Sequence, residues 1–242
     1  MTAMLAIGAV SALLPASAAA GIFELGVPKS PLVAPVCPPT VTASNCTIIL
    51  TQVTALATIR DGVAYPTTVT KAGKIVAFSL GLSRLDKNLT TAKNDVHFLD
   101  TTYGGTARAG ITILKLVGKK SLRRWKVMAQ SPIYHLQPYL GTVVQFPLDT
   151  SIPVTPGEVV ALTVPTWAPV LSFNLPTTKF AYRQSRASNC NHPAATTQTQ
   201  TTIGASTRYV CDYPGTRVEY SATEVSNPVP PKIQIHAADV PR

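Results

Sequence analysis

A long stretch of the chain, residues 131–178, contains no Lys or Arg and only two acidic residues, Asp149 and Glu158. Its apolar residues occur in short runs, VVQF at 143–146 and VVALTV at 159–164, which Pro and Gly separate. Short runs rich in β-branched residues and bounded by turn residues are typical of strands inside a sheet. We therefore expect both runs to be strands that are buried on both faces.

Composition also favours strands over helices. Charged residues make up only 13% of the 242 residues, whereas Thr, Val, Ser and Pro are abundant. Helices usually need more Glu, Lys and Gln than this, and no convincing amphipathic helix is visible after residue 20. Turn signals recur roughly every 8–12 residues, as in sandwiches and barrels. We predict an all-β protein, an antiparallel β-sandwich of about eight to ten strands with a jelly-roll-like arrangement.

The first segment, residues 1–20, is an uncharged apolar run that ends in three alanines. This ending matches the A-x-A preference of signal peptidase, so the segment is predicted to be a signal peptide and the protein to be secreted. The alternative, a membrane anchor, is disfavoured because Pro15 and the Ala-rich end suit a membrane span poorly. The rest is then one domain, residues 21–242, with a Pro-rich arm at 21–44 and a mobile tail at 226–242.

The chain has four cysteines, Cys37, Cys46, Cys190 and Cys211. In an exported protein, four cysteines most simply form two disulfides. Of the three pairings, we favour Cys37 with Cys46 and Cys190 with Cys211, because each then closes a local loop. No C-x-x-C or H-x-x-x-H spacing indicates a metal site, and no cofactor is expected.

One local pattern occurs twice, as VTKAGKIVAFSL at 69–80 and as VTPGEVVALTV at 154–164. In each copy Val-Thr leads into a turn with Gly, where a positive φ is needed, and then into an apolar strand. The pattern indicates either a duplicated half-domain or two convergent entries into internal strands. Further strands are expected at 47–59 and 216–225, with a long irregular connection at 81–110.

Positive charge is concentrated in one part of the chain. The net charge is +10, and residues 71–130 alone carry +9. Within them, residues 111–131 predict a hairpin about a Gly-Lys-Lys-Ser turn, with Trp125 pointing inward because side chains alternate along a strand. The candidate residues for binding a polyanion are Lys115, Lys119, Lys120, Arg123, Arg124 and Lys126. The alternative is that these charges protect a sheet edge from aggregation.

Aromatic residues suggest a second kind of contact. Trp167 follows a predicted strand and stands between two prolines, and Tyr134 and Tyr139 flank the turn before Gly141. Exposed Trp and Tyr rings can stack on sugars through their apolar faces. Trp167, Tyr134 and Tyr139 are therefore candidates for an aromatic platform, against the alternative of packing in the core or at its rim.

The sequence does not favour an enzyme. It has no G-x-S-x-G nucleophile elbow, and its four histidines, His97, His135, His192 and His236, lie far apart. Glycoside hydrolysis needs two facing carboxylates, but the acids near predicted strand ends form no E-x-D or D-x-E pair. These acids are Asp149, Glu158, Asp212 and Glu219.

Four segments together resemble a group of bacterial secreted β-sandwich proteins of uncharacterised function. They are 69–80, Tyr103-Gly104-Gly105, 127–139 (VMAQSPIYHLQPY) and 154–169. The resemblance covers most of residues 45–225 and implies export and a sandwich fold, but it supplies no catalytic residues. A general likeness to jelly-roll carbohydrate-binding modules is an analogy of fold alone.

Together, these features predict a secreted, non-enzymatic binding or surface protein that contacts an anionic polysaccharide or cell-wall polymer. Nucleic acid is not expected as the natural partner, because export separates the protein from most of it and no recognition helix is visible. No membrane contact is expected after cleavage of the signal peptide. The alternatives are a secreted hydrolase on a sandwich scaffold and a structural subunit of a surface layer, the latter suggested by the Pro-rich segment 28–39.

Overall fold

The computed structural model describes residues 20–39, 41, 46–188, 190 and 199–228. In this part of the chain, antiparallel strands form the sheets and one α-helix accompanies them. The prediction of an all-β protein is therefore confirmed in part: the described chain is mostly β with antiparallel sheets, but it also contains a helix. The predicted signal peptide and most of the predicted C-terminal tail lie outside the described residues.

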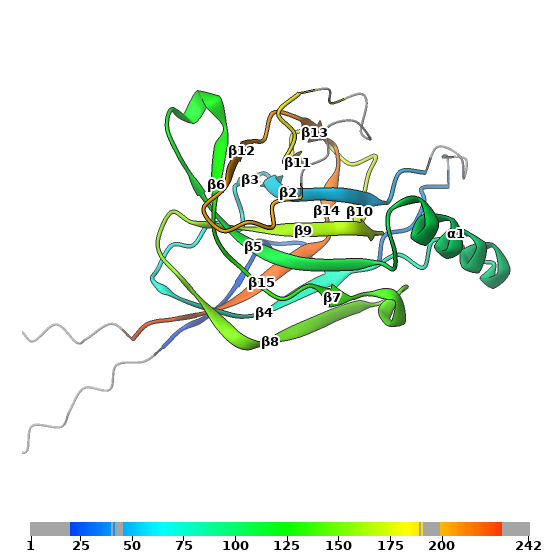
Figure 1. Cartoon of the computed structure of the whole chain (residues 1–242), viewed down its shortest axis with the longest axis horizontal. Helices are drawn as coiled ribbons and strands as arrows, with labels where there is room; N and C mark the ends of the chain where they lie inside the picture. The colour runs from blue at the N-terminus through cyan, green and yellow to red at the C-terminus, as the bar shows by residue number, and fades with distance from the viewer. Residues whose placement is uncertain (1–19, 40, 42–45, 189, 191–198, 229–242) are drawn as a thin grey trace, which may run out of the picture.

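Four strands form the smaller sheet (Figure 1). Their order is β1 (Ile22–Leu25), β15 (Tyr220–Ser226), β4 (Gly73–Gly81) and β8 (Val143–Val154). All neighbouring pairs are antiparallel. The predicted arm thus begins as a strand of this sheet, because β1 pairs along its whole length with β15.

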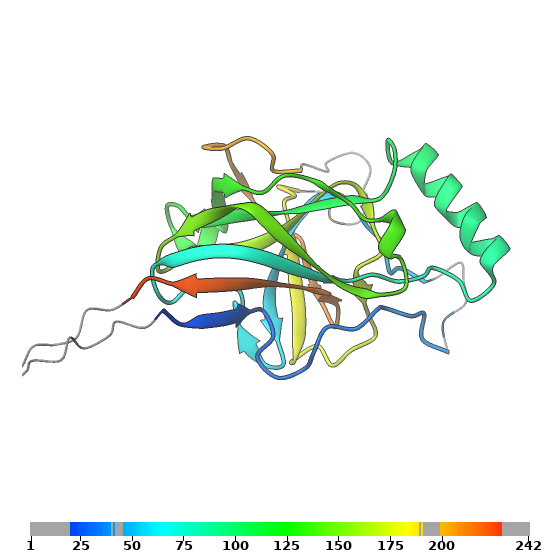
Figure 2. The same ribbon diagram turned by 90° about the horizontal axis from the view of Figure 1, so that it is seen from below.

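The larger sheet curls into a half-barrel of seven strands that packs against the smaller sheet (Figures 1 and 2). Its order is β12 (Ser206–Arg208), β6 (Arg124–Gln130), β5 (Arg108–Leu116), β9 (Val159–Ala168), β2 (Leu50–Arg60), β11 (Phe180–Gln184) and β13 (Asp212–Pro214). Two short strands extend the larger sheet: β3 (Val63–Ala64) pairs with β2 and β7 (Tyr134–His135) with β5. A separate two-stranded sheet is formed by β10 (Leu171–Ser172) and β14 (Arg217–Val218). Two 3-10 turns are η2 (Lys120–Leu122) and η3 (Gln137–Tyr139).

Apolar side chains pack on both faces of the curled sheet. The main cluster lies between the two sheets and includes Val53, Phe78, Leu80, Ile111, Leu162, Val164 and Trp167, all with zero exposure. A second cluster on the other face consists of Leu56, Leu114, Trp125, Val127, Val159, Ala161 and Tyr209. Since β9 contributes alternate residues to both clusters, the prediction that 159–164 is buried on both faces is confirmed.

The corresponding prediction for 143–146 is wrong. This segment begins β8, which pairs only with β4 and so forms an edge of the smaller sheet. Val143 is 51% exposed, whereas Phe146 points into the core. β8 also contains Pro147 and Pro153, and a residue without a backbone N–H is tolerated at an edge because one side of that strand has no partner.

The connection at 81–110 contains the helix α1 (Leu89–Thr102), which the sequence did not predict. The Asn88 side chain caps its first turn by accepting hydrogen bonds from the backbone N–H groups of Thr90 and Thr91. Only Ala92 and Leu99 of the helix are buried, so it lacks the apolar stripe by which surface helices are recognised. It projects from one end of the two sheets (Figure 2).

The repeated pattern does mark two internal strands. β4 lies between β15 and β8, and β9 lies between β5 and β2. Gly157 has the expected positive φ of 85°. Gly73 does not, because it already belongs to β4; a Cβ there would lie 2.5 Å from the carbonyl oxygen of Val225, so close strand packing is what requires glycine at this position.

Both predicted disulfides are present, Cys37–Cys46 and Cys190–Cys211, with Cα atoms 5.7 Å and 5.2 Å apart. Two disulfides indicate that the protein folds in an oxidising compartment. None of the helices in the described part of the chain is long and apolar enough to span a membrane.

Candidate functional site

The predicted hairpin is present, and its turn and the adjoining ends of its two strands carry all six candidate basic residues. β5 and β6 pair antiparallel, with Lys115 opposite Lys126 and Leu116 opposite Trp125. We call the exposed set Lys115, Lys119, Lys120, Arg123, Arg124 and Lys126 the basic tip. Trp125 points inward and is only 5% exposed, so the alternation predicted from the sequence is confirmed.

The backbone of the turn fixes where the basic side chains stand. Gly118 has a φ of 72° and Arg123 a φ of 48°, both left-handed, on either side of η2. The Val117 N–H donates to the Arg124 carbonyl oxygen at 2.9 Å and closes the hairpin. Because this short turn reverses the chain, cations from both strands and from the turn gather at one end of the molecule.

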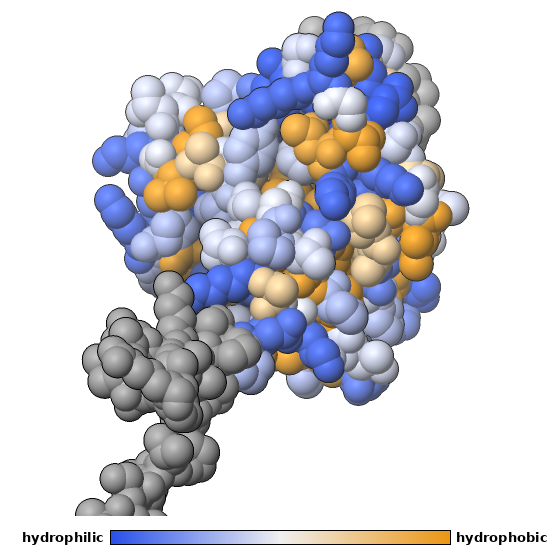
Figure 3. Space-filling model, turned by 90° about the vertical axis from the view of Figure 1, so that its left-hand side faces the viewer, coloured by the Kyte–Doolittle hydropathy of each residue, from blue (hydrophilic) through white to orange (hydrophobic). Residues whose placement is uncertain are grey.

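No carboxylate in the described part of the chain forms an ion pair with the basic tip. Among the described residues, the only ion pairs are Arg60–Glu219, Arg183–Asp212 and Arg217–Glu219, and none includes a residue of the tip. Figure 3 views the left-hand side of Figure 1, where hydrophilic side chains gather over the upper part of the surface beside a small hydrophobic area. The tip is therefore a surface of uncompensated positive charge.

A seventh cation, which the sequence did not single out, extends this surface. β12 pairs with β6 and places Arg208 opposite Arg124. Arg208 is exposed, and its Nε donates to the Leu122 carbonyl oxygen at 3.3 Å. The alternation of residue types along 206–210 is the one local signal that could have indicated a strand here. Nothing in this segment indicates that the strand pairs with β6.

A small cavity lies at the base of the tip. Its volume is about 190 Å³, and it is lined by Tyr65, Thr68, Leu116, Lys120, Arg123, Trp125, Gly157 and Val159. The rings of Tyr65 and Trp125 stand 6.0 Å apart between centroids and form part of its floor. The cavity thus combines two cations with two aromatic side chains, in a space too small for a whole drug-sized ligand.

Tyr65 is held in place by an unusual backbone conformation. Its φ is 46°, a left-handed value that is rare for an aromatic residue. Its N–H donates to the Thr58 carbonyl oxygen at 2.8 Å, and its own carbonyl oxygen accepts from Thr68 Oγ1 at 2.7 Å. These contacts lock the turn that aims the ring at Trp125, a role that the sequence did not reveal.

The aromatic candidates lie elsewhere. Trp167 is fully buried, and its Nε1 donates to Asp100 Oδ1 at 2.9 Å and to the Gly105 carbonyl oxygen at 3.1 Å. Its indole therefore presents no face to solvent for stacking on a sugar; packing in the core satisfies its one polar atom. The platform hypothesis of a Trp167, Tyr134 and Tyr139 surface loses its central member for this reason.

Tyr134 and Tyr139 do lie near each other, around Phe146. The ring centroid of each lies 5.3 Å from that of Phe146, and Tyr139 is 40% exposed. However, β7 places Tyr134 opposite Ala109, at the far end of β5 from Lys115. Six residues of strand separate those two positions, about 20 Å at about 3.3 Å per residue, so the structure does not join the aromatic and basic candidates.

The acids near strand ends form no facing pair. Glu158 Oε2 accepts from the Thr155 N–H at 2.7 Å, Asp149 is exposed on β8, and Asp212 and Glu219 bind arginines. His192 and His236 lie outside the described residues. Within the described residues, no group of three or more His, Cys, Asp or Glu side chains could hold a metal ion.

Comparison with known proteins adds no relative. No family model, no curated protein and no solved structure matches this chain.

Proposed function

We propose that this protein is a secreted, non-enzymatic binding protein that contacts an anionic polysaccharide or cell-wall polymer through the basic tip. The observation that carries the proposal is that seven exposed cations, the six of the tip and Arg208, share one end of the molecule with no carboxylate partner among the described residues. Such a surface attracts polyanions by releasing their counterions, which gives strong salt dependence.

The cavity at the base of the tip favours a polymer with bulky repeating units as the partner, over a polymer that would be recognised by its charge alone. Lys120 and Arg123 line it together with the Tyr65 and Trp125 rings. An acidic sugar has both an anionic group for the cations and an apolar ring face for the aromatic side chains. At about 190 Å³, the cavity fits one such group rather than a whole oligosaccharide.

The alternative role of the charges, protection of an exposed edge, is weakened by the pairing of β6. Its outer side is already bonded to β12 at three positions, Arg124, Trp125 and Lys126. The strand that carries Arg124 and Lys126 of the tip is therefore not a free edge there. Contact with an anionic partner suits the concentration of these cations better than edge protection does.

We propose a jelly roll as the finer description of the fold, on the basis of strand pairing. Its eight main strands are β1, β2, β4, β5, β6, β8, β9 and β15 in chain order. The first pairs with the last, the second with the seventh, the third with the sixth and the fourth with the fifth. This is the pairing of one long antiparallel ribbon rolled into two sheets, as in jelly rolls. Lectin domains use this fold, but that likeness is an analogy and not evidence of sugar binding.

Secretion belongs to the same proposal. The apolar run at 1–20 ends in a signal-peptidase motif, and the two disulfides need an oxidising compartment. Outside the cell, acidic polysaccharides and wall polymers are the abundant polyanions, whereas nucleic acid is scarce.

The test compares two variants that lose the same number of charges. In the tip variant, Lys119, Lys120 and Arg124 become Ser and Arg123 becomes Asn, which tolerates its left-handed backbone. In the control variant, the exposed residues Lys29, Lys74, Lys87 and Lys93 become Ser. We expect the tip variant to lose retention on immobilised heparin near physiological salt, and the control variant to elute close to the wild type.

Two outcomes would overturn the proposal. Equal losses in the two variants would mean that net charge, and not the tip, sets retention. Unchanged retention of the tip variant, accompanied by new aggregation, would assign the cations to edge protection instead.

A further inference from the structure

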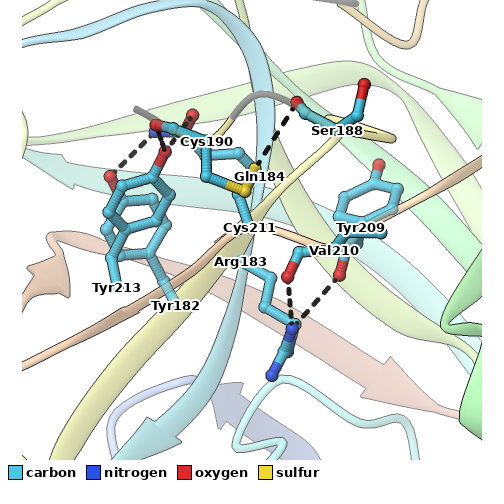
Figure 4. The surroundings of a disulfide bond; sticks show 9 residues. All are labelled: Tyr182, Arg183, Gln184, Ser188, Cys190, Tyr209, Val210, Cys211 and Tyr213. Carbon is cyan, nitrogen blue, oxygen red and sulfur yellow. Dashed lines mark hydrogen bonds between the residues drawn. A yellow bond between two sulfur atoms is a disulfide. The ribbon is translucent and has the colours of Figure 1, made fainter. Parts of the chain in front are cut away.

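A larger cavity lies away from the basic tip, beside the Cys190–Cys211 disulfide. Its volume is about 700 Å³, within the range of small-molecule sites. It is lined by Cys46, Thr47, Ile49, Thr51, Gln52, Thr102, Tyr103, Leu171, Phe173, Tyr182, Gln184, Arg186, Cys190, Tyr213 and Thr216. Figure 4 shows part of its wall around the disulfide. Among the described residues of this lining, Arg186 is the only Lys or Arg, and none is Asp or Glu.

Arg186 is buried and has no anionic partner among the residues that the structure describes. It is only 2% exposed, and its Nε has no hydrogen-bond partner. None of the three ion pairs among the described residues includes it. A buried guanidinium normally has a carboxylate or several acceptors around it, because removing the charge from water is costly. A buried, unpaired cation that lines a cavity is suited to binding an anionic ligand that enters the cavity.

Two stacked tyrosines stand beside it. The rings of Tyr182 and Tyr213 lie 4.9 Å apart and are nearly parallel, at 19° (Figure 4). Gln184 Nε2 donates to Tyr182 Oη at 2.9 Å, and Tyr213 Oη donates to Gln184 Oε1 at 3.3 Å. Since Tyr182 Oη accepts in this chain of bonds, its own proton has no acceptor among the described contacts and can be donated to a ligand.

The pKa shifts of the two tyrosines agree with hydroxyls that are buried near Arg186. Burial raises the pKa of Tyr182 well above its ordinary value of 10.0, while the charge of Arg186 acts in the opposite direction. Burial likewise raises the pKa of Tyr213, and Arg186 again opposes it. Both hydroxyls thus stay protonated at neutral pH, close enough to Arg186 to feel its charge.

The lining also includes apolar residues and one residue with a strained backbone. Ile49, Leu171 and Phe173 offer apolar surface. Gln52 has a φ of 46° at the point where the register of β2 against β9 shifts. A left-handed glutamine in the middle of a strand costs free energy, and here the bulge that contains it shapes the wall of the cavity.

We propose that this cavity binds a small organic carboxylate. Its carboxylate group pairs with Arg186 and accepts a hydrogen bond from the Tyr182 hydroxyl, and its body packs against the tyrosine pair and the apolar wall. One guanidinium matches the single charge and planar fork of a carboxylate. A doubly charged phosphate would remain half neutralised here, because the described residues of the lining include no second Lys or Arg.

Two probes test the proposal on the full exported protein. Sodium benzoate offers a flat apolar body and sodium D-glucuronate a sugar body, with benzamide as the uncharged match of benzoate. Backbone amide shifts measured by NMR at constant ionic strength report the site of binding. We expect at least one carboxylate to give saturable shifts confined to residues around Arg186, Tyr182 and Tyr213, and benzamide to bind at least about tenfold more weakly.

Variants then separate the buried cation from its neighbour. Arg186→Gln should weaken the bound carboxylate at least about tenfold. Arg183→Gln removes the same charge three residues away and should bind like the wild type, because Arg183 is paired with Asp212 at 2.7 Å and points away from the tyrosines (Figure 4). Tyr182→Phe keeps the ring stack and should weaken binding severalfold, which provides a second variant in case Arg186→Gln does not fold.

Three results would overturn the inference. The first is the absence of saturable shifts with both carboxylates. The second is equal binding of benzoate and benzamide. The third is unchanged affinity in Arg186→Gln, or in Tyr182→Phe if Arg186→Gln does not fold. Loss of heparin retention in the tip variant bears on a different surface, so this cavity and the basic tip succeed or fail separately.

Discussion

Arg217 Nε donates to Glu219 Oε1 at 2.5 Å, in a place where the glutamate side chain has no exposure to solvent. Ser172 Oγ donates to the same oxygen at 2.6 Å, and Arg60 Nη2 lies 3.9 Å from Glu219 Oε2. Burial, and then the charge of Arg217, lower the pKa of Arg60, whereas Glu219 raises it. One carboxylate therefore serves two buried guanidinium groups.

The first prediction concerns this carboxylate. Glu219→Gln should lower the free energy of unfolding by about 3–5 kcal/mol, because it leaves two buried cations without their anion. Denaturant titration measures the loss. The matched change, Asp212→Asn, breaks a pair whose carboxylate side chain is 44% exposed and should cost about 0–1 kcal/mol. Similar losses in the two variants would contradict the assignment.

The second prediction concerns pH. Glu224 is 1% exposed and its Oε1 has no hydrogen-bond partner; burial raises its pKa, and Lys71 only partly offsets this. The folded state then holds the Glu224 proton more tightly than the unfolded state. Stability is consequently lost as pH rises from the ordinary value of 4.5 through the raised pKa. Glu224→Gln should be more stable than the wild type at neutral pH and should flatten this part of the stability profile.

Chemical denaturation at several pH values measures that profile. A variant that is less stable at neutral pH, or that keeps the wild-type slope, would show that ionised Glu224 is well solvated or paired.

The third prediction concerns the attachment of α1. Asp100 accepts hydrogen bonds from Trp167 Nε1 at 2.9 Å and from Gln137 Nε2 at 2.9 Å and 2.7 Å. Asp100→Asn places an amide donor against these donors and should cost about 1.5–3 kcal/mol, with a change in the near-UV circular dichroism of Trp167. Asp95→Asn on the same helix is the control and should not destabilise, since burial and then Asp86 already raise the pKa of Asp95.

The fourth prediction concerns the disulfide beside the larger cavity. Replacing Cys190 and Cys211 with Ser opens a loop with a sequence separation of 21, which should cost about 3 kcal/mol by chain entropy. The main cluster between the sheets should stay folded, because it contains neither cysteine. Far-UV circular dichroism should therefore change little, while carboxylate binding falls, since Cys190 lines the cavity. Global unfolding at ambient temperature would contradict this view of the loop as peripheral.

Local patterns predicted the parts of the fold that are local. The β5–β6 hairpin needs only two strands and the turn between them, so alternation along 111–131 was enough to place Trp125 inside and the basic tip outside. The same holds for β9, whose continuous apolar run reflects burial on both faces. Both disulfides close short loops, and this favoured their pairing.

The remaining features depend on contacts between distant segments. α1 buries only Ala92 and Leu99, too few residues to give a helical period in the sequence. β8 resembles an interior strand at 143–146, and only its position in the sheet makes it an edge. Arg186 follows a strand in a polar segment and would ordinarily be taken as exposed. It is instead buried and lines a cavity together with residues from 46–52, 171–173 and 213–216, an arrangement that no spacing in the chain reveals.

The pairing of β1 with β15 brings the two ends of the folded domain together. Gly21 N–H donates to Ser226 Oγ at 3.0 Å, and the Ser226 N–H returns a bond to the Gly21 carbonyl oxygen at 2.8 Å. Domains whose ends meet in this way tolerate circular permutation and insertion into another protein. We therefore expect a circular permutant, with a short linker between these ends and new ends at the exposed turn of Gly62, to keep every sheet intact. For the same reason, we expect the domain to fold when it is inserted into another protein through its original ends.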